Sequence, residues 1–351
     1  MPRRRSGGHG LGETVPLCPV RPVFLAFSAP LLAQQYTHFR ALTMGDDGLS
    51  SWVMPDLPLH ITSGDCAGGL LVDSGVPGEV FVWHDVLYDG PRAAGWPTAE
   101  ILEARARFLE TFTGGGLSAG FVLKTLEEQY AKLRTVGEYS ECVLWFDACL
   151  FDQSMLAHIL TCLDILEIRD VLLLCVDSFP GVDPYDGLGQ LTPAQLSSVY
   201  HRRAAVSEEQ FDFARQVDWA FAVQDEVVFR DLAGMGAAPL PWVPAAVRRW
   251  LREQPDSESG LGRLEELTLD ALAGGRQRAP QVLEYARRHD EHPLYWGDTT
   301  LWRVINGLAD RNPPLVSIQG PEARLPQWEP ADIGAFVIER AGVVGQSTQS
   351  Q

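Results

Sequence analysis

The chain has 351 residues, a formal net charge of −18, and a hydrophobic fraction of 46%. This fraction is enough for a sizeable core and excludes global disorder. The acidic balance disfavours nonspecific binding to nucleic acid or to an anionic membrane, because contacts with phosphate need clustered Lys and Arg. No uninterrupted apolar run reaches the roughly 20 residues of a transmembrane helix. The composition predicts a folded, cytoplasmic protein of one or two domains.

The six cysteines show no metal-binding or disulfide spacing. None belongs to a C-x-x-C pair, and most lie in apolar runs, where cysteine behaves as a small buried hydrophobe. The spacing therefore predicts neither a zinc site nor a disulfide framework.

The first 53 residues differ from the rest of the chain. A basic start and an apolar run at 23–33 are similar to a secretory signal, but Pro30 interrupts the run. Met44 and Met54 are alternative starts just ahead of the first predicted strand. We therefore expect residues 1–53 to form a disordered extension.

Strands and helices alternate after this extension, with the first strand ending before a Gly-Asp-Cys turn that starts a helix. The next strands are predicted at Glu79–Asp85, Glu141–Asp147 and Val171–Asp177. Helices are predicted at 98–112, 118–135, 153–166, 192–203 and 207–231, the last one interrupted near Val223. Apolar strands alternating with helices are typical of parallel sheets. Residues 54–238 are thus predicted to form an α/β domain, an open, mostly parallel sheet with helices on both faces.

Each predicted strand is followed by an acidic residue: Asp65, Asp85, Asp147 and Asp177. Ligands of open α/β sheets bind at this carboxyl edge. Converging carboxylates there could hold Mg²⁺ or Mn²⁺, or act as general acid and base. The alternative is that aspartate is simply common in turns after strands.

The turn from Gly64 to Gly69 is a candidate anion site. Backbone N–H groups at a helix start favour phosphate or carboxylate, and Gly64, Gly68 and Gly69 allow close approach of a ligand. The turn matches neither the dinucleotide fingerprint nor the phosphate loop. The alternative is that Asp65 only caps the helix.

Two further residues could take part in catalysis with Asp65 and Asp85. Cys66 lies at a predicted helix start, which stabilises a thiolate, and Gly64-Asp65-Cys66 resembles the nucleophile block of SGNH hydrolases with Cys in place of Ser. No matching Asp-x-x-His block follows. His84 could be a base or a metal ligand. A strand histidine such as His60 or His84 can equally be a hydrogen-bonded structural residue.

Arg202 and Arg203 form the best basic pair for an anionic ligand near the acidic edge. They also end a predicted helix, where cations commonly offset the helix dipole.

Residues 239–340 are predicted to form a helical module, with a disordered tail at 341–351. Helices are expected at 245–253, 263–273, 280–288 and 299–310, with a strand at 313–318, and the last three helices with this strand resemble a winged helix. Residues 261–312 hold seven Arg against eight Asp and Glu, so the basic footprint of a DNA-binding face is missing. A protein partner is favoured over nucleic acid.

Three segments together resemble the bacterial family called domain of unknown function 1835: HITSGDCAGGLL, VFVWHDVLYDGP and LWFDACLFDQSML. The resemblance covers roughly residues 57–180. The matching positions are Gly64, Asp65, Cys66, Ala67 and Gly68; Asp85, Gly90 and Pro91; and Trp145, Asp152 and Gln153. Cys66 departs from the family's usual Ser. The resemblance implies no activity.

The sequence favours binding of a small anionic or nucleotide-like ligand at the strand edge, and a divalent metal could assist this binding. Asp65, Asp85 and Asp147 would be ligands or proton-transfer groups, and the turn from Gly64 to Gly69 would hold the anion. A non-catalytic regulator with the C-terminal module as output is the second hypothesis. A hydrolase with Cys66 as nucleophile is the third. The sequence leaves open whether the protein is an enzyme.

Overall fold

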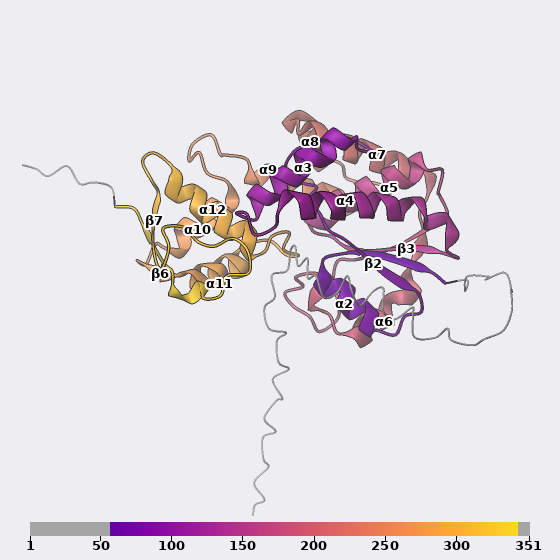
Figure 1. Ribbon diagram of the computed structural model, residues 1–351, viewed down its shortest axis with the longest axis horizontal. Coiled ribbons are helices and arrows are strands. Elements are labelled where there is room, and N and C mark those ends of the chain that lie inside the picture. Colours follow the sequence, from indigo (N-terminus) through magenta and orange to yellow (C-terminus); the bar gives the residue numbers. More distant parts are fainter. Residues whose placement is uncertain (1–56, 343–351) are drawn as a thin grey trace, which may run out of the picture.

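The computed structural model describes residues 57–342, and its central element is a five-stranded sheet (Figure 1). The strands are β1 (Leu59–Ser63), β2 (Glu79–Trp83), β3 (Cys142–Asp147), β4 (Val171–Val176) and β5 (Ala204–Ala205). Their spatial order is β2-β1-β3-β4-β5. The first four strands run parallel, and β5 pairs antiparallel with β4. The predicted α/β fold with a mostly parallel sheet is confirmed.

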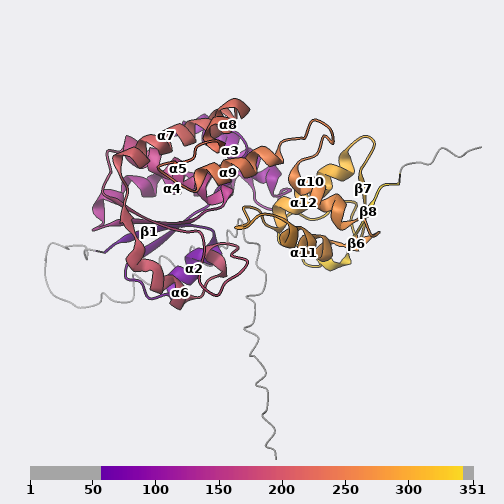
Figure 2. The ribbon, with the colours of Figure 1, turned by 180° about the vertical axis from the view of Figure 1, so that it is seen from behind.

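Helices cover both faces of the sheet (Figures 1 and 2). One face carries α2 (Asp65–Asp73) and α6 (Pro193–Val199). The other face carries a thicker layer formed by α3 (Ala99–Phe112), α4 (Ala119–Arg134), α5 (Leu150–Ile165), α7 (Glu208–Val223), α8 (Glu226–Ala233) and α9 (Val243–Glu253). A strand that lies between two helical layers is buried on both faces, which explains why these strands are continuous apolar runs.

Two central strands are buried along their whole length. Every residue of β1 and of β3 is buried, including the polar residues Ser63 and Asp147 at their carboxyl ends. Buried polar groups need hydrogen-bond partners. The ends of β1 and β3 are therefore places where the fold requires a polar network.

Helix α5 lies at the centre of the thicker layer. Its first fourteen residues are all buried, and it packs against α7 and α9. Cys149 is its N-cap, with the sulfur accepting from the backbone N–H of Asp152, so the helix begins earlier than the predicted start at Gln153. The interruption predicted near Val223 is a break between α7 and α8, where Gln224 has a φ of 51° and Asp225 caps α8.

The C-terminal part combines helices with a small sheet. Its elements are α10 (Arg263–Ala271), β6 (Gln277–Arg278), α11 (Ala279–His289), α12 (Asp298–Asp310), β7 (Val316–Gln319) and β8 (Val337–Arg340). β8 lies between β6 and β7 and pairs antiparallel with both. The strand predicted at 313–318 corresponds to β7.

This part packs directly on the α/β domain, beside α3 and α9 (Figure 1). One hydrophobic cluster runs through both. Trp250 of α9 donates from its indole nitrogen to the carbonyl of Tyr88 at 3.2 Å, and the rings of Tyr88 and Tyr295 lie 5.2 Å apart. Helix α9 follows the predicted boundary at residue 239 but packs with the α/β domain.

The predicted extension at 1–53 lies outside the described residues. The predicted tail at 341–351 lies outside them from residue 343 onward. Among residues 57–342, no helix has the length and apolar character needed to cross a membrane.

Candidate functional site

The strand order reverses between β1 and β3, and we refer to the region at the carboxyl ends of these two strands as the crevice. From β1 the chain crosses through α2 on one face to reach β2, and from β2 it returns through α3 and α4 on the other face to reach β3. The carboxyl ends of neighbouring strands at such a reversal are where open α/β sheets bind ligands. Here they are followed by two turns, Ser63–Cys66 and Asp147–Asp152.

The first turn brings Asp65 and His84 together. Gly64 has a φ of 69° and occupies the N-cap of α2 without a side-chain cap, so Asp65 is inside the helix and does not cap it. Asp65 Oδ1 lies 2.8 Å from Nε2 of His84, and its buried Oδ2 has no hydrogen-bond partner among the described residues. Cys66 is the half-buried neighbour of this pair. An acid that orients a histidine is one element of acid–base chemistry.

The second turn holds two carboxyl groups in a network that joins β3 to β1. Asp152 Oδ2 accepts from the backbone N–H of Asp147 at 2.6 Å, and Oδ1 accepts from the hydroxyl of Ser63. Asp147 Oδ1 accepts from the backbone N–H of Cys149 at 2.8 Å. Burial raises the pKa of Asp147 to about 6, and burial with the charge of Asp147 raises the pKa of Asp152 well above its usual range. The pair therefore tends to retain a proton near neutral pH.

A loop between β4 and α6 closes over these carboxyl groups. Gly187 has a φ of 129°, and a Cβ at this position would lie 2.5 Å from Oδ2 of Asp147. The backbone N–H of Leu188 bonds to the same side chain. Asp186 faces the other way, 3.1 Å from Arg287 and 2.5 Å from Nδ1 of His292. The loop therefore contacts both the crevice and the C-terminal part.

Asp85 lies apart from the crevice acids. It is fully buried and accepts two bonds from Nε of Arg105, at 2.7 and 2.9 Å. The same guanidinium donates to the carbonyls of Val86, Asp89 and Pro91. Asp85 thus fixes the loop after β2, because its carboxylate is committed to a buried ion pair.

Other predicted residues are also placed away from the crevice. Asp177 is exposed and accepts from the indole nitrogen of Trp242 at 3.1 Å. Arg202 is exposed at the end of a short 3-10 helix, and Arg203 pairs at 3.6 Å with Glu141, which precedes β3. The side chain of Arg203 is therefore held at the amino-terminal end of β3, opposite the predicted ligand site.

Gly68 and His60 have packing roles. A Cβ on Gly68 would lie 2.3 Å from Cγ2 of Val82, so this glycine lets α2 approach β2, while Gly69 faces open space. His60 is buried and accepts from the indole nitrogen of Trp145 at 3.1 Å, as expected of a structural histidine.

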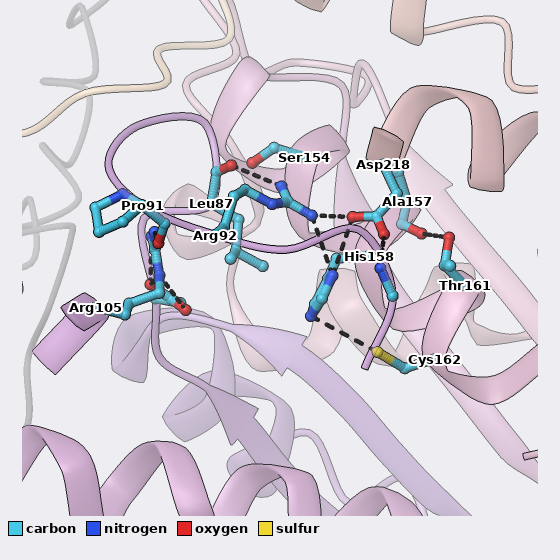
Figure 3. Close-up of polar contacts among 12 residues, drawn as sticks. Leu87, Pro91, Arg92, Arg105, Ser154, Ala157, His158, Thr161, Cys162 and Asp218 are labelled. Atoms are coloured by element: carbon cyan, nitrogen blue, oxygen red, sulfur yellow. Dashed lines mark hydrogen bonds and ion pairs between the residues drawn. The ribbon is translucent and has the colours of Figure 1, made fainter. Parts of the chain in front are cut away.

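A second polar network lies inside the thicker helical layer (Figure 3). Arg92 pairs with Asp218 and lies 3.0 Å from Nδ1 of His158, which also contacts Asp218 at 3.0 Å. The hydroxyl of Tyr130 lies 2.7 Å from Nε2 of His158, and Cys162 lies beside the same nitrogen. These residues are buried, and the network ties the loop after β2 to α5 and α7.

We expect acid to destabilise the protein through His158. Burial, followed by the charges of Arg92 and Arg105, holds the pKa of His158 well below 6.5. Below that pH, His158 is protonated in the unfolded chain and stays neutral in the folded protein. The free energy of unfolding therefore falls, by up to roughly 1.4 kcal/mol per pH unit. Urea denaturation between pH 7.5 and 5 should show a shallower dependence in His158→Gln and an unchanged one in the exposed control His201→Gln. An equal dependence of the free energy of unfolding on pH in all three proteins would show that His158 does not cause the loss of stability in acid.

A surface hollow of about 730 Å³ lies elsewhere, between α7 and α8. Half-exposed Trp219 lines it together with Met235. None of the predicted site residues lines it.

Sequence reasoning did not assign Ser63, Cys149 or Asp152 to the site, nor Tyr185, a buried residue of the loop that closes over Asp147. The sequence predicts Cys149 only as one of the cysteines in apolar runs, and Asp152 only as the residue before the helix predicted at 153–166. The available signal was the spacing Asp-x-Cys-x-x-Asp at the junction of a strand and a helix, which places three potential ligands in one turn. Tyr185 carried no such signal, because its position depends on how the loop folds back.

Comparisons with known proteins identify no family. No family profile matches the chain, and no curated protein matches it. Among solved structures, the DNA-binding, cleavage and re-ligation domain of Plasmodium falciparum topoisomerase II aligns with 82% of this chain at 11% identity and a TM-score of 0.42. The chain spans 47% of that structure's length. A similarity of this level assigns neither fold family nor function.

Proposed function

We propose that this chain is a cytoplasmic protein that binds a small anionic or nucleotide-like ligand in the crevice between the carboxyl ends of β1 and β3. The observation that carries the proposal is the reversal of strand order at this point, combined with the start of α2, which has no side-chain cap. The N–H groups in the first turn of a helix favour an anion. The polar turn after β3 forms the facing wall.

The acidic residues of the crevice are compatible with an anion. Asp65 is paired with His84, and Asp147 with Asp152 forms a buried pair that tends to retain a proton. The retained proton lowers the negative charge that a ligand would meet at Asp147 and Asp152. Asp65 and His84 would orient the ligand or move a proton.

We further propose membership of the bacterial family called domain of unknown function 1835. The residues of the resemblance have distinct positions in the fold. The Gly64-to-Gly68 turn starts α2, Asp85 anchors the loop after β2, and Asp152 stabilises the turn after β3. A family pattern that spans a ligand edge and its supporting loop fits a binding domain.

A regulatory role is the second candidate, and one contact favours it. Asp186, in the loop that covers the crevice, pairs with Arg287 of α11 and with His292. A ligand that moves this loop would disturb both pairs. The α/β domain would then be a sensor and the C-terminal part its output.

We propose that the output part is winged-helix-like and binds protein. Three helices are followed by the paired strands β7 and β8, which would form the wing. The last helix, α12, directs Arg303 to Asp89 at 3.0 Å and over the ring of Phe112. Its basic residue is thus engaged within the chain, which disfavours DNA as the partner.

A thermal-shift screen of the full chain tests the binding proposal. The panel contains nucleotides, sugar phosphates and acyl esters, each with and without Mg²⁺ or Mn²⁺, and turnover of the esters is followed in parallel. A ligand at 100 times its dissociation constant should add about 2.7 kcal/mol of stability and raise the midpoint. We expect Asp65→Asn to abolish the shift and Asp73→Asn, exposed at the other end of α2, to retain it.

The same samples separate the two candidates. Hydrogen exchange of α11 that changes with ligand, without turnover, supports the sensor. An unshifted midpoint across the panel, or equal behaviour of the two variants, contradicts a ligand site at the start of α2.

A further inference from the structure

We propose that Asp147, Cys149 and Asp152 bind a divalent zinc ion at the floor of the crevice. The three ligand atoms lie within 4.8 Å of one another, and all three residues are buried. The inference deepens the proposed function by placing a cation in the same crevice, and it rests on that location but not on the identity of the anion.

The three ligand atoms lie within 4.8 Å of one another, so small movements of their side chains would bring them to the spacing of a single ion. Zinc bonds of about 2.0–2.3 Å in a tetrahedral arrangement require ligand atoms on the order of 3–4 Å apart. The end of β3 and the first turn of α5 supply all three ligands from six consecutive residues. Both elements are deep in the core, so the ligands are held by a rigid frame.

Neighbouring groups already fix the orientation of the carboxylates. Ser63 and the backbone N–H of Asp147 bond to the two oxygens of Asp152, and the backbone N–H groups of Cys149 and Leu188 bond to Asp147. A carboxylate oxygen has two lone pairs, so each can accept a hydrogen bond and still bind a metal. Outer contacts of this kind orient metal ligands in proteins.

A buried hydroxyl supplies the second, independent indication of a ligand. The side chain of Tyr185 is 6% exposed, and its hydroxyl has no hydrogen-bond partner among residues 57–342. Tyr185 lies two residues before Gly187, in the loop that closes over Asp147. Three protein ligands leave a fourth position on zinc, and an oxygen bound there would accept from Tyr185.

The chemistry of the ligands selects the metal. Within the described part of the chain, no Lys, Arg or His forms an ion pair with Asp147 or Asp152. A buried carboxylate pair of this kind is stabilised by a cation. A thiolate ligand favours zinc, whereas Mg²⁺ prefers oxygen ligands and retains its waters. The fourth position would then accept an anionic oxygen of the ligand.

Metal uptake by the full chain tests the site without any anion. We would dialyse the protein against Zn²⁺, measure bound zinc by mass spectrometry, and titrate Co²⁺ while recording its thiolate charge-transfer absorption. Cys149→Ser should abolish the absorption, and Asp152→Asn should weaken binding at least tenfold. Cys142→Ser, buried at the other end of β3, and Asp177→Asn, after the adjacent strand, are matched controls that should bind like the unaltered protein.

The outcomes separate this site from the binding proposal. Absence of bound zinc and of the Co²⁺–thiolate band in the unaltered protein would overturn the inference, as would equal losses in the control variants. Circular dichroism identifies any variant that fails to fold, and the Co²⁺ band of the unaltered protein decides the question in that case. Zinc uptake without any hit in the ligand screen supports the metal site and contradicts only the proposal that the crevice binds an anionic ligand.

Discussion

Asp218→Asn is expected to lower the free energy of unfolding by about 3–5 kcal/mol. The substitution leaves the Arg92 guanidinium buried beside His158 without its counter-ion. Burial, and then Arg105, already lowers the pKa of Arg92 to about 10, so Asp218 offsets a real desolvation cost. The amide nitrogen of Asn would also face a second donor in either orientation, because Asp218 accepts from Arg92 and, at 2.6 Å, from the backbone N–H of Gly95. Urea denaturation followed by tryptophan fluorescence measures the loss.

Two comparisons isolate the buried ion pair. Asp212→Asn lies on the same helix, where Asp212 is exposed and pairs with Arg215, so it should cost at most about 1 kcal/mol. Arg92→Met combined with Asp218→Leu should recover much of the stability, because replacing both partners removes the uncompensated charge. Equal losses in Asp218→Asn and Asp212→Asn would show that the network contributes nothing specific.

The sheet was largely predictable because its signal is local. Continuous apolar runs such as 171–176 identify strands buried on both faces, and β4 lies at this position. The turn at Gly64 was equally readable, since a glycine after a strand and before a helix marks a change of backbone direction. The boundaries of α5 were less predictable, because a cysteine cap has no propensity signal.

The roles of the acidic residues could not be predicted from the sequence, because each role depends on partners that are far away along the chain. Asp85 and Asp147 both follow apolar strands. Asp85 is neutralised by Arg105, twenty residues later, and so becomes structural. Among the described residues, Asp147 forms no ion pair. It accepts hydrogen bonds and lies beside a second acid, Asp152, so no positive charge compensates its carboxylate. A sequence pattern places both at a strand end but does not show which one a helix will supply with a cation.

The small sheet of the C-terminal part illustrates the same limit. β6 is only Gln277–Arg278, two polar residues without an apolar alternation. It becomes a strand by pairing with β8, whose partner residues Val337 and Ile338 come some sixty residues later. Only β7 carried a local signal, as the apolar segment after Pro314.

Arg105→Lys is expected to cost roughly 3 kcal/mol of stability although it preserves the charge. The guanidinium bonds to both oxygens of Asp85 and to three backbone carbonyls, and a lysine ammonium has only three donors with which to replace them. The carbonyls of Val86 and Pro91 would lose buried partners. Urea denaturation of this variant and of Arg107→Lys, exposed on the same helix, measures the difference, and the control should change by less than about 0.5 kcal/mol.

The same substitution connects the supporting loop to the crevice. Asp85 directly follows His84, whose ring is held 2.8 Å from Asp65. When the loop loses its anchor, the His84 ring loses its fixed position, so any ligand found in the thermal-shift screen should bind Arg105→Lys more weakly than Arg107→Lys. A variant that is destabilised but binds with unchanged affinity would limit Arg105 to folding. It would also show that the Asp65–His84 pair is positioned by α2 and Gln129, which accepts from the backbone N–H of His84.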